Sequence, residues 1–154
     1  MSNLTKARAV ALIVPVALVG GAYGFQYLAG LTACEMCWWQ RYAHFAAIAL
    51  AVAAFVLRPM RLWVALAGLA ILASALIGGY HAGVEYGWWK GLTECTSLVS
   101  FAKGGDPLAA IMNAPIIRCD VVQWKIFGIS LAGFNFILSA LGAGAVFALL
   151  RRKA

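Results

Sequence analysis

The chain has 154 residues, of which 64% are hydrophobic and only 11% are charged, and its mean hydropathy is +0.89. A soluble domain of this length has too much surface for its volume to hide so many apolar side chains. The composition therefore excludes an ordinary water-soluble domain. It predicts an integral membrane protein built as one membrane domain over residues 1–154.

The first apolar run covers residues 9–32, after Lys6 and Arg8, and carries no charge. About 20 helical residues rise roughly 30 Å, enough to cross the hydrocarbon core, so we predict a transmembrane helix here. A cleavable signal peptide is the competing interpretation, but its apolar region spans only about 7–15 residues. The sequence Leu-Thr-Ala-Cys at residues 31–34 also resembles the box cut before a lipid-modified cysteine. The remaining chain is too apolar for a tethered soluble domain.

Cys34 and Cys37 stand between the first and second apolar runs, in the order Cys-Glu-Met-Cys. Cysteines with this spacing can be joined as a disulfide or opened as a dithiol. If the second run is a helix, both thiols lie at its N-terminal end, where the helix dipole stabilises a thiolate. Arg41 follows Cys37 by four residues, so we expect a positive charge on the same helix face beside that sulfur. The alternative for Arg41 is a side chain that reaches the lipid headgroups.

Three further apolar runs follow, and a basic turn at residues 58–61 separates the second from the third. The third run contains Gly68, Gly78 and Gly79, small residues that let membrane helices approach closely. Asn135 in the last run is expected to hydrogen-bond between helices. The predicted fold class is therefore an all-α, four-transmembrane-helix bundle. Its predicted spans are residues 9–32, 42–57, 62–80 and 126–150.

Residues 81–125 differ in composition from the apolar runs on either side. They hold most of the acids, Cys95, Cys119 and a Gly-Gly-Asp-Pro turn signal at residues 104–107. We predict a long loop outside the bilayer, in which residues 107–114 form a short helix on the membrane surface.

The charges are distributed unevenly between the two ends of the predicted bundle. Four crossings put both termini on one side, and that side with the 58–61 turn carries seven bases and no acid. The other side carries five bases and five acids. This pattern places both termini in the cytoplasm, so the net charge of +7 reports orientation and not nucleic-acid binding. All four cysteines then face the compartment where disulfides persist.

The four cysteines are interpreted as redox-active. A tetrahedral zinc site typically uses two close pairs, but 23 residues separate Cys95 from Cys119, so no metal site is predicted. Structural disulfides remain an alternative, although Cys34 and Cys37 close too small a ring to stabilise the fold much. Ionisable groups near membrane spans are functional candidates, and among the histidines His81 is preferred to His44.

With these features the chain resembles the bacterial inner-membrane disulfide bond formation protein B (DsbB) family over nearly its whole length. The resemblance is carried by the four spans, by Cys-x-x-Cys-x-x-Gln-Arg at residues 34–41 and by Tyr-His-Ala-Gly-Val-Glu at residues 80–85. The long outer loop with two cysteines completes it. The combination is more specific than a Cys-x-x-Cys alone.

The resemblance implies an enzyme that oxidises the dithiol of a periplasmic DsbA-like thioredoxin-fold protein and passes the electrons to membrane quinone. Matched by position, Cys95 forms the mixed disulfide with the partner. Cys119 pairs with Cys95 and relays the exchange to Cys34, and Cys37 is freed as the thiolate that faces the quinone.

The resemblance also implies a quinone, ubiquinone or menaquinone, bound between helices near the periplasmic face of the lipid bilayer. Arg41 and Cys37 are the implied quinone contacts, with His81 as a further one. One rival is an enzyme of the vitamin K epoxide reductase type, in which the Cys-x-x-Cys follows the loop pair instead of preceding it. A non-enzymatic membrane subunit with structural disulfides is the other.

Overall fold

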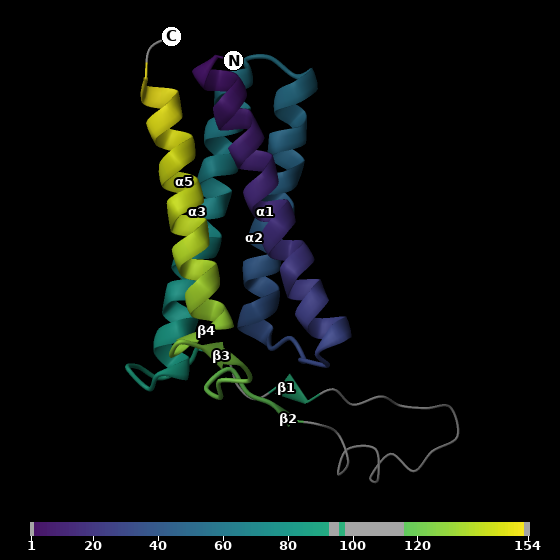
Figure 1. Cartoon of the computed structure of the whole chain (residues 1–154), viewed down its shortest axis with the longest axis vertical. Coiled ribbons are helices and arrows are strands. Elements are labelled where there is room, and N and C mark those ends of the chain that lie inside the picture. Colours follow the sequence, from purple (N-terminus) through teal and green to yellow (C-terminus); the bar gives the residue numbers. More distant parts are fainter. Residues whose placement is uncertain (1, 93–95, 98–115, 153–154) are drawn as a thin grey trace, which may run out of the picture.

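The computed structural model describes residues 2–92, 96–97 and 116–152. Four long helices form an elongated bundle, and α1 begins at the end of the bundle where α5 ends (Figure 1). The segments that join α3 to α5 lie at the opposite end. The helices are α1 (Asn3–Leu28), α2 (Glu35–Val56), α3 (Met60–Glu85) and α5 (Leu131–Arg151).

Three of the four helices begin at a residue whose side chain accepts a hydrogen bond from the first turn. Ser2 caps α1 and Ser130 caps α5 with their hydroxyl oxygens. Cys34 caps α2, because its sulfur accepts from the backbone N–H of Cys37 at 3.4 Å. Each cap satisfies a backbone donor that has no partner within the helix. The first cysteine therefore fixes where α2 starts.

Among the described residues, α1, α3 and α5 are long and apolar enough to cross a membrane. Their outward surfaces carry large exposed apolar side chains, such as Leu69, Leu76 and Leu141. Helix α2 is not among these three. It contains Gln40, Arg41 and His44, whose polar side chains are buried along its inner face. The predicted all-helical architecture with four long helices is confirmed.

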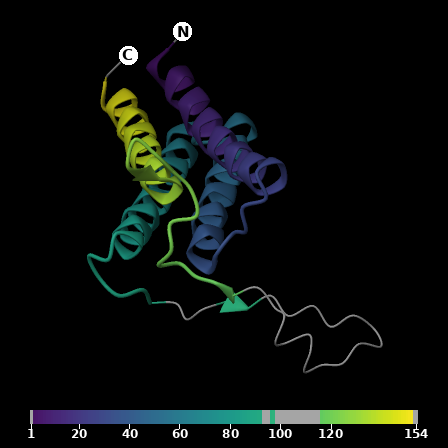
Figure 2. The ribbon, with the colours of Figure 1, turned by 60° about the horizontal axis from the view of Figure 1, so that its bottom comes forward.

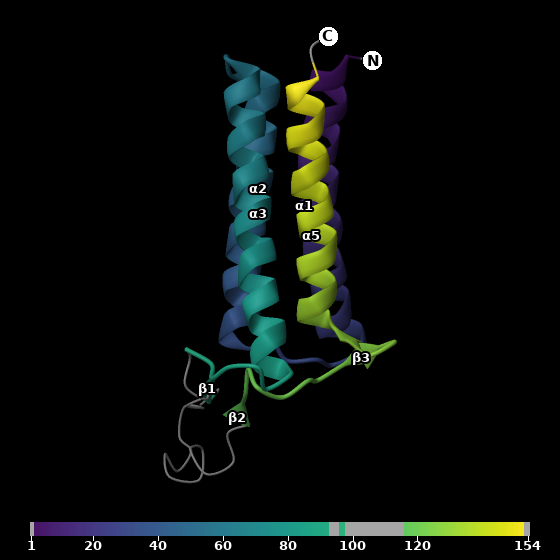
Figure 3. The same cartoon turned by 90° about the vertical axis from the view of Figure 1, so that its left-hand side faces the viewer.

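Figures 2 and 3 show the bundle from two further directions, and in it α3 packs against both α2 and α5, while α1 packs against α5 and α2. Gly78 lets α3 and α5 approach closely, since a Cβ there would lie 2.8 Å from Asn135 Nδ2 and 3.1 Å from the Ala132 oxygen. A Cβ on Gly68 would meet Val146 at 3.0 Å. The small residues of the third apolar run therefore serve the helix packing expected of them.

Helix α3 continues through Glu85, past the predicted end of its span at residue 80. His81 and Glu85 are consequently one helical turn apart on the same helix, and their side chains are 2% and 8% exposed. The prediction that His81 begins the loop was wrong. The helix persists because its last turn is packed against the segment that returns from the loop.

Helix α5 begins at Leu131 and not near residue 126, because a hairpin precedes it. Strand β3 (Lys125–Ile126) pairs with β4 (Ile129–Ser130), and the turn residues Phe127 and Gly128 have φ angles of 51° and 80°. Left-handed conformations at both turn positions suit a tight two-residue hairpin. The apolar residues of this hairpin continue the composition of α5, which is why the sequence pattern merged the two.

A second short ladder lies in the connection between α3 and α5. Strand β1 (Thr96–Ser97) pairs antiparallel with β2 (Ile116–Ile117). Cys95 and the predicted surface helix at residues 107–114 lie outside the described residues.

Candidate redox site

Cys34 and Cys37 lie at the start of α2 as two thiols with their sulfurs 2.9 Å apart. The Cys34 thiol donates to the Cys37 sulfur. Cys37 lies in the first turn of the helix, so the helix dipole and this hydrogen bond both favour negative charge on its sulfur. The expected dithiol at a helix N-terminus is present. Cys34 is 2% exposed, whereas Cys37 is only partly buried.

The loop brings Cys119 to the same place. Cys119 is buried in one cluster with Cys34, Met36 and Val84. A side-chain hydrogen bond with Cys119, another with Cys37, and burial together raise the pKa of the Cys34 thiol. A third sulfur therefore meets the pair although it follows Cys34 by 85 residues in the chain.

The segment around Cys119 is held at the mouth of the bundle by polar contacts. Arg118 donates to both carboxylate oxygens of Asp120, at 2.9 and 2.6 Å, which holds the pKa of Asp120 below its usual range. Gln123 donates to the backbone oxygen of Thr32 at 2.8 Å, in the connection between α1 and α2. These contacts position the returning chain over the cysteines.

A cavity of about 490 Å³ opens beside the cysteines, between α1, α2, α5 and the segment at 118–124. Apolar side chains form most of its wall, and the Trp124 ring closes it with ring contacts to Phe25 at 4.8 Å and Phe134 at 6.3 Å. This size and lining are typical of a site for an apolar organic molecule. Polar side chains also line it, among them Cys34, Cys37, Arg41, His81 and Glu85.

Arg41 lines this cavity but points toward α1. Its guanidinium donates to Gln26 Oε1 at 2.6 Å and to the Ala22 oxygen at 3.3 Å, and it lies over the rings of Tyr23 and Trp38. Among the described contacts, none joins Arg41 to the Cys37 sulfur. The two residues share the cavity wall, so the expected charge lies beside the site without touching that thiol. Arg41 is 6% exposed, which excludes a headgroup-bound side chain.

His81 lies against the first cysteine. Its Nε2 atom is 3.6 Å from the Cys34 sulfur and 3.9 Å from Glu85 Oε1, and its Nδ1 atom is 3.0 Å from Gln40 Nε2. One ligand atom from each of Cys34, Cys37 and His81 lies within 4.8 Å of the others.

Behind His81 a chain of hydrogen bonds crosses the bundle from α2 to α5. Asn135 Nδ2 donates to Gln40 Oε1 at 2.8 Å and to the Ser74 oxygen at 3.2 Å. Asn135 Oδ1 lies 2.9 Å from His44 Nε2, which is also 2.9 Å from the Ser74 hydroxyl. Asn135 is thus the interhelical bond former that the sequence predicts. His44 serves this buried network, away from the sulfurs.

Sequence reasoning did not single out Gln40, Ser74 or Glu85 as site residues. Gln40 belongs to the motif at residues 34–41 and Glu85 to the run at residues 80–85, so both were within signals already noted. Ser74 lies in an apolar run, and nothing in the sequence marks it.

Comparisons with known proteins place the chain in a family. The family described as disulfide bond formation protein DsbB matches residues 5–149. Disulfide bond formation protein B of Aromatoleum aromaticum is 36% identical over 151 residues, covering 89% of each chain. An uncharacterized protein of Rickettsia prowazekii is 25% identical over 134 residues, covering 84% of this chain and 78% of its own. No solved structure matches. The chain belongs to the DsbB family of disulfide bond formation proteins.

Proposed function

We propose that this protein oxidises the dithiol of a periplasmic DsbA-like thioredoxin-fold protein and passes the electrons through its cysteines to membrane quinone. Family membership supports a disulfide-generating thiol oxidoreductase. The observation that carries the finer proposal is the meeting of Cys34 with Cys37 and Cys119, beside an apolar cavity that Cys34 and Cys37 line.

The exchange between the two cysteine pairs is the first chemical step within the chain. A thiolate of the partner attacks Cys95 of a Cys95–Cys119 disulfide, which forms the mixed disulfide and releases Cys119 as a thiolate. A Cys119 thiolate attacks Cys34 of an oxidised Cys34–Cys37 pair, forming a Cys34–Cys119 bond and releasing the electron pair to Cys37. The hydrogen bond between Cys119 and Cys34 supports this order of attack. Cys37 is a good leaving group because it lies in the first turn of α2.

The residues around the cavity fit a quinone. Such a molecule has a flat ring with two polar oxygens and a long apolar tail, and it supplies an acceptor for two electrons and two protons. The cavity provides apolar walls along α1 and α5 for the tail. Of its polar lining residues, Arg41 would hold a ring oxygen, and Cys37 would present its sulfur to the ring. His81 lies on the Cys34 side, which favours a role with the thiols.

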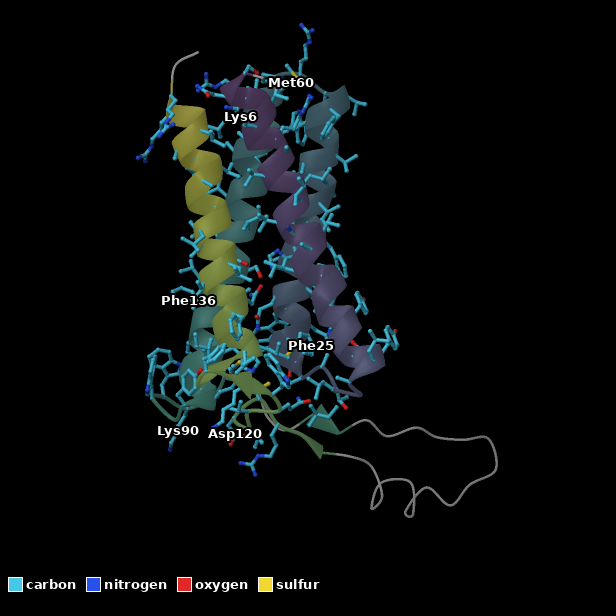
Figure 4. All side chains as sticks on the ribbon, viewed as in Figure 1. Lys6, Phe25, Met60, Lys90, Asp120 and Phe136 are labelled. Atoms are coloured by element: carbon cyan, nitrogen blue, oxygen red, sulfur yellow. The ribbon has the colours of Figure 1, made fainter. Side chains whose placement is uncertain are left out.

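We further propose that α2 crosses the membrane with the other three helices, so that both termini lie in the cytoplasm of the bacterial inner membrane. Lys6 lies at one end of the bundle, whereas Lys90 and Asp120 lie at the other (Figure 4). Further basic residues near the same ends of the helices are Arg8 in α1, Arg58 and Arg61 at the α2–α3 connection, and Arg151 and Arg152 at the end of α5. The polar residues of α2 face inward, where neighbouring helices satisfy them.

The test is to replace Cys37 by serine in the full-length protein and to supply a soluble quinone and a reduced DsbA-like protein. Quinone reduction, followed by absorbance, is expected to be lost in Cys37→Ser. The control Ala46→Ser adds a serine to an exposed position of the same helix and should retain it. Undiminished quinone reduction in Cys37→Ser contradicts the proposal. So does a thiol-trapping gel on intact cells in which all cysteines stay oxidised whether or not quinone is available.

A further inference from the structure

We infer that Gln40 is a positioning residue that holds the His81 ring in one tautomer, with the Nε2 proton directed at the Cys34 sulfur. The inference rests on the proposed function, because it concerns the release of Cys34 as a thiolate. It assigns His81 to the thiol chemistry. It also explains the buried polar residues beside His81, because Asn135 orients the Gln40 amide and Gln40 orients the His81 ring.

The orientation of the Asn135 amide follows from a backbone contact. The Ser74 carbonyl oxygen lies 3.2 Å from the Asn135 side chain, and a carbonyl oxygen only accepts hydrogen bonds. The Asn135 atom at this position is therefore the NH₂ nitrogen. The same nitrogen lies 2.8 Å from Gln40, so the Gln40 atom that receives this bond is the carbonyl oxygen.

The Gln40 amide then dictates the His81 tautomer. With its oxygen directed at Asn135, its NH₂ group donates to the Met36 oxygen at 3.1 Å and to His81 Nδ1 at 3.0 Å. The Met36 contact confirms the assignment independently, because it too is a backbone carbonyl. Nδ1 must accept, and a neutral imidazole then carries its proton on Nε2.

The Nε2 atom faces the sulfur that changes charge during exchange. The Cys34 sulfur is 3.6 Å from it. Glu85 Oε1 is 3.9 Å from the same atom, and the Cys119 backbone also hydrogen-bonds to the ring. When the Cys95 thiolate attacks Cys119 and re-forms the Cys95–Cys119 disulfide, the electron pair of the Cys34–Cys119 bond passes to Cys34. An N–H directed at the sulfur stabilises this charge. The opposite tautomer would present a lone pair to it.

The same tautomer bears on the cluster of Cys34, Cys37 and His81. A histidine ligates a metal through a deprotonated ring nitrogen. Here the nitrogen that faces the sulfurs holds the proton, and Gln40 blocks the proton from moving to Nδ1. The arrangement thus favours hydrogen bonding to sulfur over metal ligation.

The tautomer is measurable in the resting protein by ¹⁵N NMR of histidine side chains in detergent micelles. The chain has only two histidines, so a His44→Asn variant assigns the spectrum. The expected result is a protonated Nε2 and an unprotonated Nδ1 for His81. Gln40→Leu should allow a second population with the proton on Nδ1. Gln123→Leu, the same change at a glutamine that bonds Thr32, should not. A proton on Nδ1 in the unmodified protein overturns the inference without any variant.

A kinetic readout tests whether Gln40 acts through His81. The measured rate is single-turnover oxidation of a reduced DsbA-like protein without quinone. Loss of this hydrogen bond to a charged sulfur should slow the oxidation about tenfold in His81→Phe. Gln40→Leu should slow it less, in proportion to the fraction of rings that carry the proton on Nδ1. The double variant should be no slower than His81→Phe, whereas multiplied effects overturn the inference. The NMR result needs no partner or quinone, so its failure leaves the oxidase proposal standing. Absence of oxidation by the unmodified protein would instead defeat that proposal.

Discussion

Cys34 donates its thiol proton to Cys37 across 2.9 Å, and the backbone N–H of Cys37 donates back to the Cys34 sulfur at 3.4 Å. This reciprocal contact makes the two sulfurs unequal although they are close together. Negative charge is favoured on Cys37 at the helix start, while Cys34 remains a thiol between Cys119 and His81. This difference is the physical reason to assign Cys34 to the exchange with Cys119 and Cys37 to the reaction with a molecule in the cavity.

The first prediction concerns alkylation of the reduced protein as a function of pH. An ordinary cysteine ionises near pH 8.5. Because its neighbours and burial raise the pKa of Cys34, less of it is thiolate at any given pH. Its alkylation should therefore stay slow through pH 8.5 and rise only above that value. Labelled peptides quantified by mass spectrometry give the profile for each cysteine. Burial alone lowers the rate at every pH equally, so a midpoint at or below pH 8.5 contradicts the raised pKa.

The second prediction concerns Arg41, whose guanidinium donates to Gln26 and to the Ala22 oxygen at the cavity wall. Arg41→Met should raise the KM for quinone about tenfold or more, because a hydrogen bond to a charged group is worth about 1.5–3 kcal/mol. Arg41→Lys keeps the charge but loses the planar guanidinium, so its KM for quinone should lie between those of the unmodified protein and Arg41→Met. Steady-state quinone reduction measures the KM of each variant. Lys90→Met removes an exposed charge and serves as the control. An unchanged KM for quinone in Arg41→Met would contradict a role of Arg41 in quinone binding.

The third prediction concerns the contact of α3 with α5. Gly78→Ala places a methyl group 2.8 Å from Asn135 Nδ2 and 3.1 Å from the Ala132 backbone oxygen. The helices must separate, which should cost about 1–3 kcal/mol of unfolding free energy. Gly144→Ala is the matched control, since its Cβ meets nothing within 4 Å. Unfolding in mixed micelles compares the two. Equal stability of both variants contradicts the close approach.

The fourth prediction concerns orientation in the membrane. A phosphatase that is active only outside the cytoplasm should be active when fused after Trp88 and inactive when fused after Arg58. The basic excess at the end of the bundle that holds Lys6 predicts this result. Expression of both fusions is checked by immunoblot. Phosphatase activity in the fusion after Arg58 and none in the fusion after Trp88 would contradict the proposed topology.

Much of the fold was readable from local patterns. The apolar runs predicted four long helices, and the glycines of the third run predicted its close packing. The helix ends were less predictable. Helix α3 continues to Glu85 because the returning segment packs against its last turn, and α5 starts late because Phe127 and Gly128 form a hairpin turn. Both depend on contacts made after the chain has folded back.

Composition and short spacings along single elements are enough to predict a membrane protein, a helical bundle and a dithiol at a helix start. The groups that meet this dithiol depend on how the helices and the returning segment pack together. Cys119 reaches Cys34 from a segment that follows α3, and Arg41 turns to α1 and not to Cys37. The bonds from His81 through Gln40 to Asn135 join three helices. Spacing along a helix fixes which residues share a face, but only the packing of the helices fixes what that face touches.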